Sequence, residues 1–380
     1  MNTSVAILGV GITKIEKAKK KQKLDEMVFE AASSALLDAG LDRGQLDSVV
    51  ISGCDELDGR CISSMLLAMP AGAYLKDEIK VTDEGCYGVI LAALRLMTGQ
   101  FNLSMVVGWC KTSEAPVSNI MNMRWDPFYH RGFGMNHVAA NALMASAYLG
   151  RYGISTDVPA MIVVKNRGNG RKNKLAQLRQ SVTLAQIRSS RIVSWPLREL
   201  DCAPESDGAC ALILASRRKA KELKSDPVWI TGLGWATDSY YLGERDLAES
   251  SSTHIAASRA YSMTKIKNPL RALDVAEISD FTSYHELIAC EGLGFCGPGK
   301  AEDIVRDGST QIGGMLPVNP SGGILSGNPM MTSGLFRICE AYLQAAGKAG
   351  DHQVPGVRKA LAQGSTGFCA QGNAVFILQS

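Results

Sequence analysis

The segment Val5-Ala-Ile-Leu-Gly9-Val-Gly11-Ile-Thr13 returns in the second half of the chain as Val228-Trp-Ile-Thr-Gly232-Leu-Gly234-Trp-Ala236. Each copy is an apolar, β-rich run that ends in Gly-x-Gly, which predicts a strand followed by a turn. A pattern that recurs at this distance indicates a duplicated architecture. We therefore predict two halves, residues 1–225 and 226–380, joined by the polar, lysine-rich stretch 216–226.

A Gly-x-Gly after a strand also occurs in dinucleotide-binding sites. There, a third small residue lets the following helix pack close to the strand. In this chain Gly11 is followed by Ile-Thr-Lys14, so the third small residue is missing. The motif does not support a nucleotide cofactor.

Segments with helical and strand-like spacing alternate between the two copies. The pattern predicts helices over 24–39 and 138–152, and strands over 48–52 and 103–108. This alternation is typical of an α/β fold in which helices cover a mixed sheet. Residues 110–200 interrupt the first half as an insertion, and such excursions commonly build a substrate site.

The bulk composition excludes several classes of protein. Of the 380 residues 46% are hydrophobic and 20% charged, as in soluble globular proteins, and a net charge of +3 gives no nucleic-acid footprint. The ten cysteines include no CxxC pair, so we predict reduced thiols and no metal site. With no secretory leader and no apolar stretch long enough for a membrane span, we expect a cytoplasmic protein.

The stretch Val81-Thr-Asp-Glu-Gly-Cys86-Tyr-Gly88 carries the first candidate for chemistry. We expect a strand to end before Cys86 and a helix to follow over 89–97. A thiol at a helix N-terminus is favoured as thiolate by the helix dipole and the free N–H groups. Gly85 and Gly88 allow a sharp turn and the close approach of a ligand. Cys86 is therefore a candidate nucleophile, and an ordinary buried cysteine is the alternative.

Together with this turn, several blocks resemble the thiolase superfamily, in the branch of the sterol-carrier-protein-type and archaeal acetyl-CoA acetyltransferases. Their order and spacing hold over nearly the whole chain. Besides the turn at Cys86, the blocks are residues 161–173, 201–209, 273–278, 286–294 and 318–329.

The resemblance implies the five-layered αβαβα thiolase fold, in which each half supplies a mixed five-stranded sheet, and it implies a homodimer. It also implies an acyl-CoA substrate, with coenzyme A as co-substrate and no permanently bound cofactor. Members of this branch often work with a small zinc-ribbon/OB-fold partner subunit. The reaction implied is thiolysis, in which a 3-oxoacyl-CoA is cleaved by CoA through an acyl-Cys86 intermediate.

The acid/base positions of this chain depart from the family pattern. Asn328 replaces the histidine of the family's Gly-His-Pro loop; asparagine can donate a hydrogen bond to an oxyanion but cannot take a proton. The histidine of the family's His-Asp-x-Phe motif is also missing, because that stretch reads Ser279-Asp-Phe-Thr282. We expect His285 to take over the acid/base work, since imidazole titrates near neutral pH. The alternative is a helix-start residue bonded to the backbone.

The stretch 364–372 resembles the family's last active-site loop. Cys369 falls near the acid/base position of that loop and is a candidate for it, with buried packing as the alternative. Candidate substrate-binding residues come from this loop, from the turn at Cys86, from the 318–329 block and from the insertion. They are Tyr87, Phe133, Met135, Gly323 and Gly367.

Three functions remain open on these observations. The first is a thiolase, supported by Cys86. The second is a thiolase-like retro-aldol lyase acting on a 3-hydroxyacyl-CoA, whose members tend to lack the cysteine. The third is a non-catalytic CoA-ester-binding scaffold, for which lost histidines would be expected. The divergent loops favour a bulky, aromatic or carboxylated substrate, for example benzoylsuccinyl-CoA.

Overall fold

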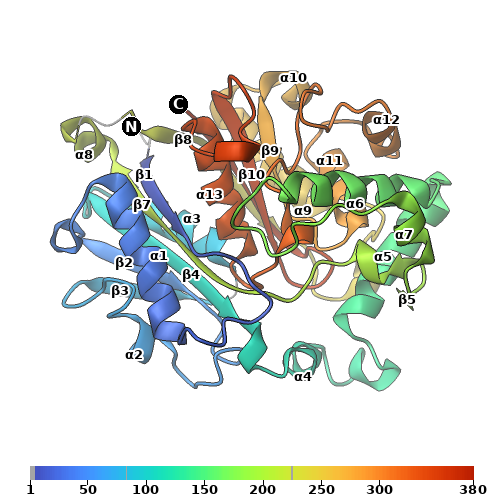
Figure 1. Cartoon of the computed structure of the whole chain (residues 1–380), viewed down its shortest axis with the longest axis horizontal. Coiled ribbons are helices and arrows are strands. Elements are labelled where there is room, and N and C mark those ends of the chain that lie inside the picture. The colour runs from blue at the N-terminus through green and yellow to red at the C-terminus, as the bar shows by residue number, and fades with distance from the viewer. Residues whose placement is uncertain (1–4, 83, 224–225) are drawn as a thin grey trace.

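The computed structural model describes residues 5–82, 84–223 and 226–380 (Figure 1). The first half contributes strands β1 (Val5–Ile12), β2 (Ser48–Ser52), β3 (Asp77–Val81), β4 (Leu103–Lys111) and β7 (Asp207–Ser216). The second half contributes β8 (Val228–Thr237), β9 (Val275–Glu277), β10 (Lys359–Thr366) and β11 (Gly372–Gln379). The described strands form a mixed sheet in the order β3-β2-β4-β7-β1-β8-β11-β10-β9. The predicted α/β class is confirmed.

The two halves meet edge to edge, because β1 and β8 are antiparallel neighbours with Val5 opposite Ile230. Within the described residues the second half supplies four strands to this sheet, where five were expected. The fifth position is marked by a single parallel bridge between Ala276 and Val318. Val318 is flanked by Pro317 and by Pro320 two residues on, and proline has no N–H with which to extend a ladder. The predicted boundary at residue 225 lies outside the described residues.

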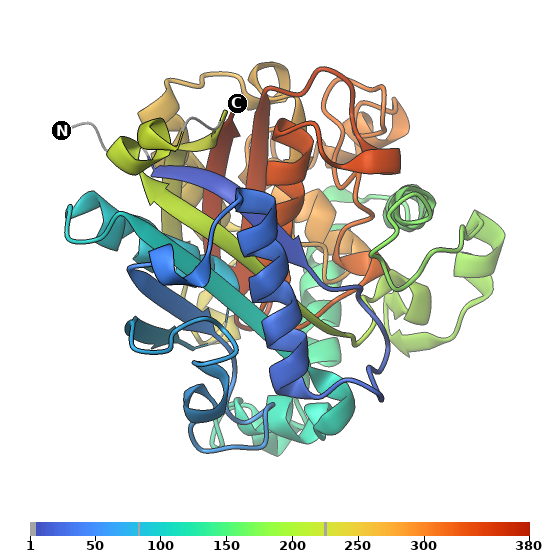
Figure 2. The same ribbon diagram turned by 60° about the vertical axis from the view of Figure 1, so that its left-hand side comes forward.

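Helices complete a five-layered arrangement. At the centre, α3 (Gly85–Met97) and α13 (Ser333–Ala345) pack against each other, α3 against β2 and β4, and α13 against β9 and β10. On the outer faces, α1 (Leu24–Ala39) covers β1, β4 and β7, and α9 (Ser251–Thr264) covers β8 and β11. Figure 2 shows α1, in blue, lying across the strands of the first half. The predicted αβαβα layering follows from these contacts.

Both Gly-x-Gly motifs lie inside strands, so the turns predicted there are wrong. A Cβ atom on Gly11 would lie 2.1 Å from the carbonyl oxygen of Ala31 on α1. In the other half, a Cβ atom on Gly234 would lie 2.1 Å from the carbonyl oxygen of Ala256 on α9. The repeated glycines thus allow an outer helix to contact the strand backbone at equivalent places in the two halves.

The insertion forms a lobe that packs on the second half. Its helices α4 (Val117–Met123), α5 (His137–Tyr152), α6 (Asp157–Gly170) and α7 (Leu184–Ser189) are followed by a hairpin of β5 (Ile192–Ser194) and β6 (Leu197–Arg198). Helix α6 contacts α11 (Ser283–Gly292) and α12 (Ala301–Arg306), which are elements of the second half. The shorter helices are α2 (Ser64–Leu67), α8 (Arg217–Glu222) and α10 (Pro269–Ala272). In the described part of the chain, no helix has the length and apolar character of a membrane span.

Candidate active site

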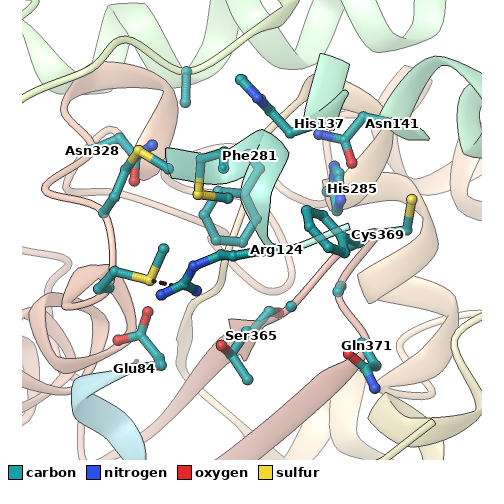
Figure 3. Close-up of a pocket in the computed structure, with 18 of the residues that line it drawn as sticks. Glu84, Arg124, His137, Asn141, Phe281, His285, Asn328, Ser365, Cys369 and Gln371 are labelled. Carbon is teal, nitrogen blue, oxygen red and sulfur yellow. Dashed lines mark hydrogen bonds between the residues drawn. The ribbon is translucent and has the colours of Figure 1, made fainter. Parts of the chain in front are cut away.

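A cavity of about 520 Å³ lies where the insertion meets the central helices and the last strands (Figure 3). Its wall is assembled from segments that are far apart in the sequence. The wall residues are Glu56, Thr82, Glu84, Leu197 and Tyr240, together with residues from the segments 121–124, 137–141, 202–205, 281–285, 328–331 and 365–371. The apolar part of the wall comes from Met121, Leu197, Phe281, Met330 and Phe368. A cavity built from both halves and the insertion is the natural place for a substrate.

Glu84, directly before α3, places a carboxyl group in this wall although the residue is only 2% exposed. Its Oε1 accepts a hydrogen bond from the Gly334 backbone N–H at 2.9 Å, and its Oε2 accepts one from the Ser333 hydroxyl at 3.2 Å. Burial raises the pKa of Glu84 to about 7, against the hydrogen bonds, which act to lower it. The carboxyl group therefore exchanges its proton near neutral pH.

Cys86, two residues further on, does not line the cavity. Its side chain is fully buried, and the wall formed by the described residues does not include it. The Sγ atom packs so closely on the backbone that a Cβ atom on Gly364 would lie 2.7 Å from it. Burial, and secondly the charge of Glu84, raise the pKa of this thiol well above its ordinary value. In this arrangement the thiol is protonated and has no exposed surface.

His285 lies in the wall, as predicted, but in a state that is unsuited to a base. The Thr282 backbone N–H donates to its Nδ1 at 3.2 Å, so Nδ1 is an acceptor and the ring hydrogen lies on Nε2. Burial, and then the charge of Arg245, lower the pKa of His285 to about 3. The ring is neutral at physiological pH and offers a hydrogen-bond donor. It is at the same time the helix-start residue of the alternative interpretation.

Asn328 also lies in the wall and is 6% exposed. Its backbone N–H donates to the Ser206 hydroxyl at 2.8 Å, while its side-chain Oδ1 has no hydrogen-bond partner among the described residues. The preceding turn is held by Asp280, which accepts from the Ile324 N–H at 2.5 Å and from the Asn166 amide at 2.7 Å. The Asn328 backbone is therefore held in place, and the side-chain oxygen is buried without a partner among the described residues.

Cys369 and Gly367 both lie in the last loop of the wall. Burial raises the pKa of the Cys369 thiol to about 12, so it keeps its proton at neutral pH. Arg245 fixes this part of the loop by donating to the backbone oxygens of Phe368 and Cys369, at 2.8 and 2.6 Å. Gly367 has a φ of +74°, and a Cβ atom there would lie 2.7 Å from Gln371 Oε1. Gly367 thus allows the backbone turn of this loop.

The other candidate substrate-binding residues lie elsewhere. Phe133 is 85% exposed, and Met135 packs against the core. Tyr87, in the first turn of α3, packs on the core, and Gly323 faces the Asp280 carboxylate. None of these four belongs to the wall formed by the described residues.

Several wall residues were not identified from the sequence: Thr82, Glu84, Arg124, His137 and Asn141. The available signal was the run Thr-Asp-Glu in a turn between two apolar segments. Glutamate is rarely fully buried unless its side chain is paired, so buried Glu84 at the start of α3 indicates a special role. In the structure this residue lines the cavity. Figure 3 shows Glu84 and Asn328 on one side of the cavity, and His285 and Cys369 on the other.

Sequence comparison identifies a protein family and several proteins to which this chain is similar. A family model described as "Thiolase C-terminal domain-like" matches residues 234–380. The acetyl-CoA acetyltransferase of Methanothermobacter thermautotrophicus is 30% identical, over 93% of this chain and 93% of that protein. Sterol carrier protein 2 of Oryctolagus cuniculus is 29% identical, over 94% of this chain and 69% of that protein. The 17-hydroxy-3-oxo-4-pregnene-20-carboxyl-CoA lyase of Mycobacterium tuberculosis is 28% identical, over 98% and 99%.

Solved structures agree with these similarities. The "Ltp2-ChsH2(DUF35) aldolase" matches with a TM-score of 0.85 and 25% identity, over 100% of this chain and 98% of that chain. The acetyl-CoA acetyltransferase of Syntrophomonas wolfei matches with a TM-score of 0.74 over 99% and 98%; at 15% identity it supports the fold alone.

Proposed function

Because the chain belongs to the thiolase superfamily of acyltransferases, in the branch of the archaeal acetyl-CoA acetyltransferases and sterol carrier protein 2, we propose that its cavity binds a CoA thioester. We propose further that it cleaves a carbon–carbon bond beside the thioester. Coenzyme A is then the thiol part of the thioester substrate and, in thiolysis, also a free co-substrate.

Two reactions fit this description, and both leave the enolate of a thioester. Each needs hydrogen-bond donors at an oxyanion and a group that moves a proton. Thiolysis additionally needs a thiolate that can reach the 3-oxo carbon, because an acyl group is transferred to it. Retro-aldol cleavage of a 3-hydroxyacyl-CoA needs no nucleophile. A base takes the 3-hydroxyl proton, the C2–C3 bond breaks with its electron pair moving into the enolate, C3 becomes a carbonyl carbon, and C2 is protonated.

The geometry supports retro-aldol cleavage best, and one observation carries this conclusion. Cys86 is protonated and sealed from the cavity, whereas the residue two positions before it presents a titrating carboxyl group in the wall. The Nε2–H of His285 and the side-chain NH2 group of Asn328 are suitable donors for the oxygen atoms that gain charge. Similarity to a lyase over nearly the full length, and to an aldolase structure at a TM-score of 0.85, supports the same reaction.

Thiolysis through an acyl-Cys86 intermediate is the second candidate. Similarity to two archaeal acetyl-CoA acetyltransferases, at 30% and 31% identity, favours it. On this proposal the first turn of α3 shifts when substrate binds and brings Sγ to the cavity. For either reaction the largely apolar wall with Arg124 at its edge suits a bulky, aromatic or carboxylated acyl group such as that of benzoylsuccinyl-CoA.

The test is to incubate wild type and Cys86→Ala with panels of 3-hydroxyacyl-CoA and, with added CoA, 3-oxoacyl-CoA esters. Retro-aldol cleavage predicts that a 3-hydroxyacyl-CoA is consumed without free CoA, that Cys86→Ala keeps this activity, and that intact-mass spectrometry finds no acyl adduct. Cys339→Ala, a change at another fully buried cysteine, controls for lost packing. An acyl adduct that disappears only in Cys86→Ala would refute the retro-aldol proposal and establish the thiolase.

We also propose a cytoplasmic homodimer with a small zinc-ribbon/OB-fold partner subunit. The two-component name of the similar aldolase structure supports a partner of this kind. Affinity purification from the native host, followed by mass determination of the complex, tests the assembly; recovery of a lone monomer would contradict it. Cell fractionation tests the compartment.

A further inference from the structure

Retro-aldol cleavage needs a group in the cavity that changes protonation state near neutral pH. The predicted acid/base residues do not meet this need. His285 has a pKa of about 3 and Cys369 a pKa of about 12, and the Asn328 amide does not titrate. Glu56 lies at the solvent edge of the wall, with its side chain 57% exposed. Glu205 of the wall is exposed as well, which leaves buried Glu84 and half-buried His137 as candidates in the described wall.

Glu84 is held more firmly than His137. Its two carboxylate oxygens are bonded to Gly334 N–H and Ser333 Oγ, at the first turn of α13. The Nδ1 atom of His137 has no partner among the described residues, so nothing there fixes its ring tautomer. Both residues begin helices, but Glu84 lies between the starts of two central helices, one from each half.

We propose that Glu84 is the catalytic acid/base of this cavity. Its carboxylate takes the proton of the substrate's 3-hydroxyl group as the C2–C3 bond breaks, and the resulting carboxylic acid returns a proton to C2 of the enolate. This assignment rests on the proposed carbon–carbon cleavage beside a CoA thioester. No oxidation or reduction occurs, and the proton that leaves oxygen balances the proton that carbon gains.

The surroundings of Glu84 suit both halves of this cycle. N–H donors at a helix N-terminus stabilise the negatively charged form of the Glu84 carboxyl group, whereas burial stabilises its neutral form. A Cβ atom on residue 334 would lie 3.1 Å from Glu84 Oε1, so glycine at this position lets the carboxylate reach the α13 backbone. Opposed effects of this kind hold the pKa of Glu84 near 7, where a group can accept and release a proton with similar ease.

The thiol and phenol groups packed around Glu84 are uncharged. The buried thiols of Cys86 on α3, Cys110 on β4 and Cys210 on β7 have pKa values raised well above the ordinary value by burial. Burial also raises the pKa of Tyr87, on the next turn of α3, so its phenol is neutral. Arg124 of α4 is the cation that shares the cavity wall. A pH profile of the reaction would therefore report Glu84 itself.

The experiment compares wild type with Glu84→Gln and Glu84→Asp. The matched control is Asp58→Asn, which removes another carboxyl whose pKa is raised by burial but which lies outside the cavity wall. Two activities are measured over pH 5 to 9: cleavage of 3-hydroxyacyl-CoA esters, and exchange of the C2 hydrogens of acetyl-CoA or propanoyl-CoA with D2O. Binding of the same acyl-CoA is measured by calorimetry, and circular dichroism checks the fold.

We expect Glu84→Gln to lower kcat for both activities by about 10²-fold or more, the usual contribution of a general acid/base. Its dissociation constant for acyl-CoA is expected to stay within about threefold of wild type, because electrostatics rather than shape is changed. The acidic limb of the wild-type profile, with an apparent pKa near 7, disappears in Glu84→Gln and persists in Asp58→Asn. Glu84→Asp is expected to recover part of the lost rate, which a purely structural role would not predict.

Other outcomes separate the two proposals. Two outcomes would overturn the assignment of Glu84 while the proposed reaction stands. In the first, Glu84→Gln cleaves substrate as well as wild type does. In the second, His137→Gln rather than Glu84→Gln removes the acidic limb of the pH profile. If wild type exchanges C2 hydrogens in a Glu84-dependent manner but cleaves no 3-hydroxyacyl-CoA, the retro-aldol reaction is overturned and the role of Glu84 as acid/base stands. If wild type does neither, both are overturned.

Discussion

Replacing Glu84 by glutamine is expected to stabilise the folded protein relative to wild type, increasingly so as the pH rises. Burial raises the pKa of this carboxyl from 4.5 to about 7. A carboxyl group with a higher pKa in the folded than in the unfolded protein binds its proton more tightly when folded. The stability that this proton contributes is complete below pH 4.5, and is lost as the pH rises through about 7.

The size of the effect follows from the pKa values. One pKa unit corresponds to about 1.4 kcal/mol, so ionised Glu84 costs the folded state about 3 kcal/mol above pH 8 and less than about 1 kcal/mol at pH 5. Glutamine has the same shape and can keep the bonds to Ser333 and Gly334, but it does not ionise. The stability difference between the variant and wild type should therefore change by about 2 to 3 kcal/mol in favour of glutamine between pH 5 and pH 8.5.

The assay is urea unfolding at both pH values, followed by tryptophan fluorescence, with the free energy of unfolding taken from midpoint and slope. Asp157→Asn is the control. Its hydrogen bond with Arg188 lowers the pKa of Asp157 below 3.8, so this carboxylate is ionised in both states across the range and its effect should not vary with pH. An equal stability difference for Glu84→Gln at pH 5 and pH 8.5 would refute the raised pKa, and with it the argument for a proton-exchanging Glu84.

Three further predictions concern other parts of the structure. In the native protein a maleimide should modify exposed Cys61 and leave buried Cys86 unmodified until denaturant is added. Peptide mass spectrometry measures the labelling of each cysteine. Labelling of Cys86 at the rate of Cys61 would contradict the burial of its side chain. Gly11→Ala should destabilise the protein by about 1 to 3 kcal/mol through overpacking against α1. Gly44→Ala, where a Cβ atom meets open space, should destabilise it far less. Thermal unfolding measures both changes, and equal losses of stability would refute the close helix contact. The ring nitrogens of His285 should show no titration between pH 5 and pH 8 in ¹⁵N NMR spectra, since its pKa is about 3; a midpoint in that range would restore it as a candidate base.

Local patterns predicted the framework well, because periodicity and helix ends depend on residues close together in the chain. The spacing of apolar residues over 24–39 predicted α1 with its observed bounds, and Gly40 ends it with a φ of +64°. The insertion helix predicted from residue 138 begins at His137, after Asn136, whose side chain accepts from Ala139 N–H. The resemblance in motif order then identified the superfamily and its layered fold.

The environments of the residues at the start of α3 could not be predicted from the local sequence, for a physical reason. Glu84 is the N-cap of α3 and has an extended backbone, whereas Cys86 lies in the first turn of the helix. Nothing in the turn itself says which side faces a cavity. The answer comes from two glycines far along the chain. The backbone N–H of Gly334, roughly 250 positions after Glu84, binds the carboxylate, and the backbone of Gly364, roughly 280 positions after Cys86, packs on the thiol.

The sequence by itself determined the duplication, the alternation of helices and strands, and the superfamily, since each is encoded in composition and order along the chain. Only the tertiary structure decided that the Gly-x-Gly motifs serve helix packing, that His285 is neutral, that Cys86 is sealed, and that Glu84 titrates near neutral pH. Burial and hydrogen bonding set these properties, and both depend on groups that only the folded chain brings together.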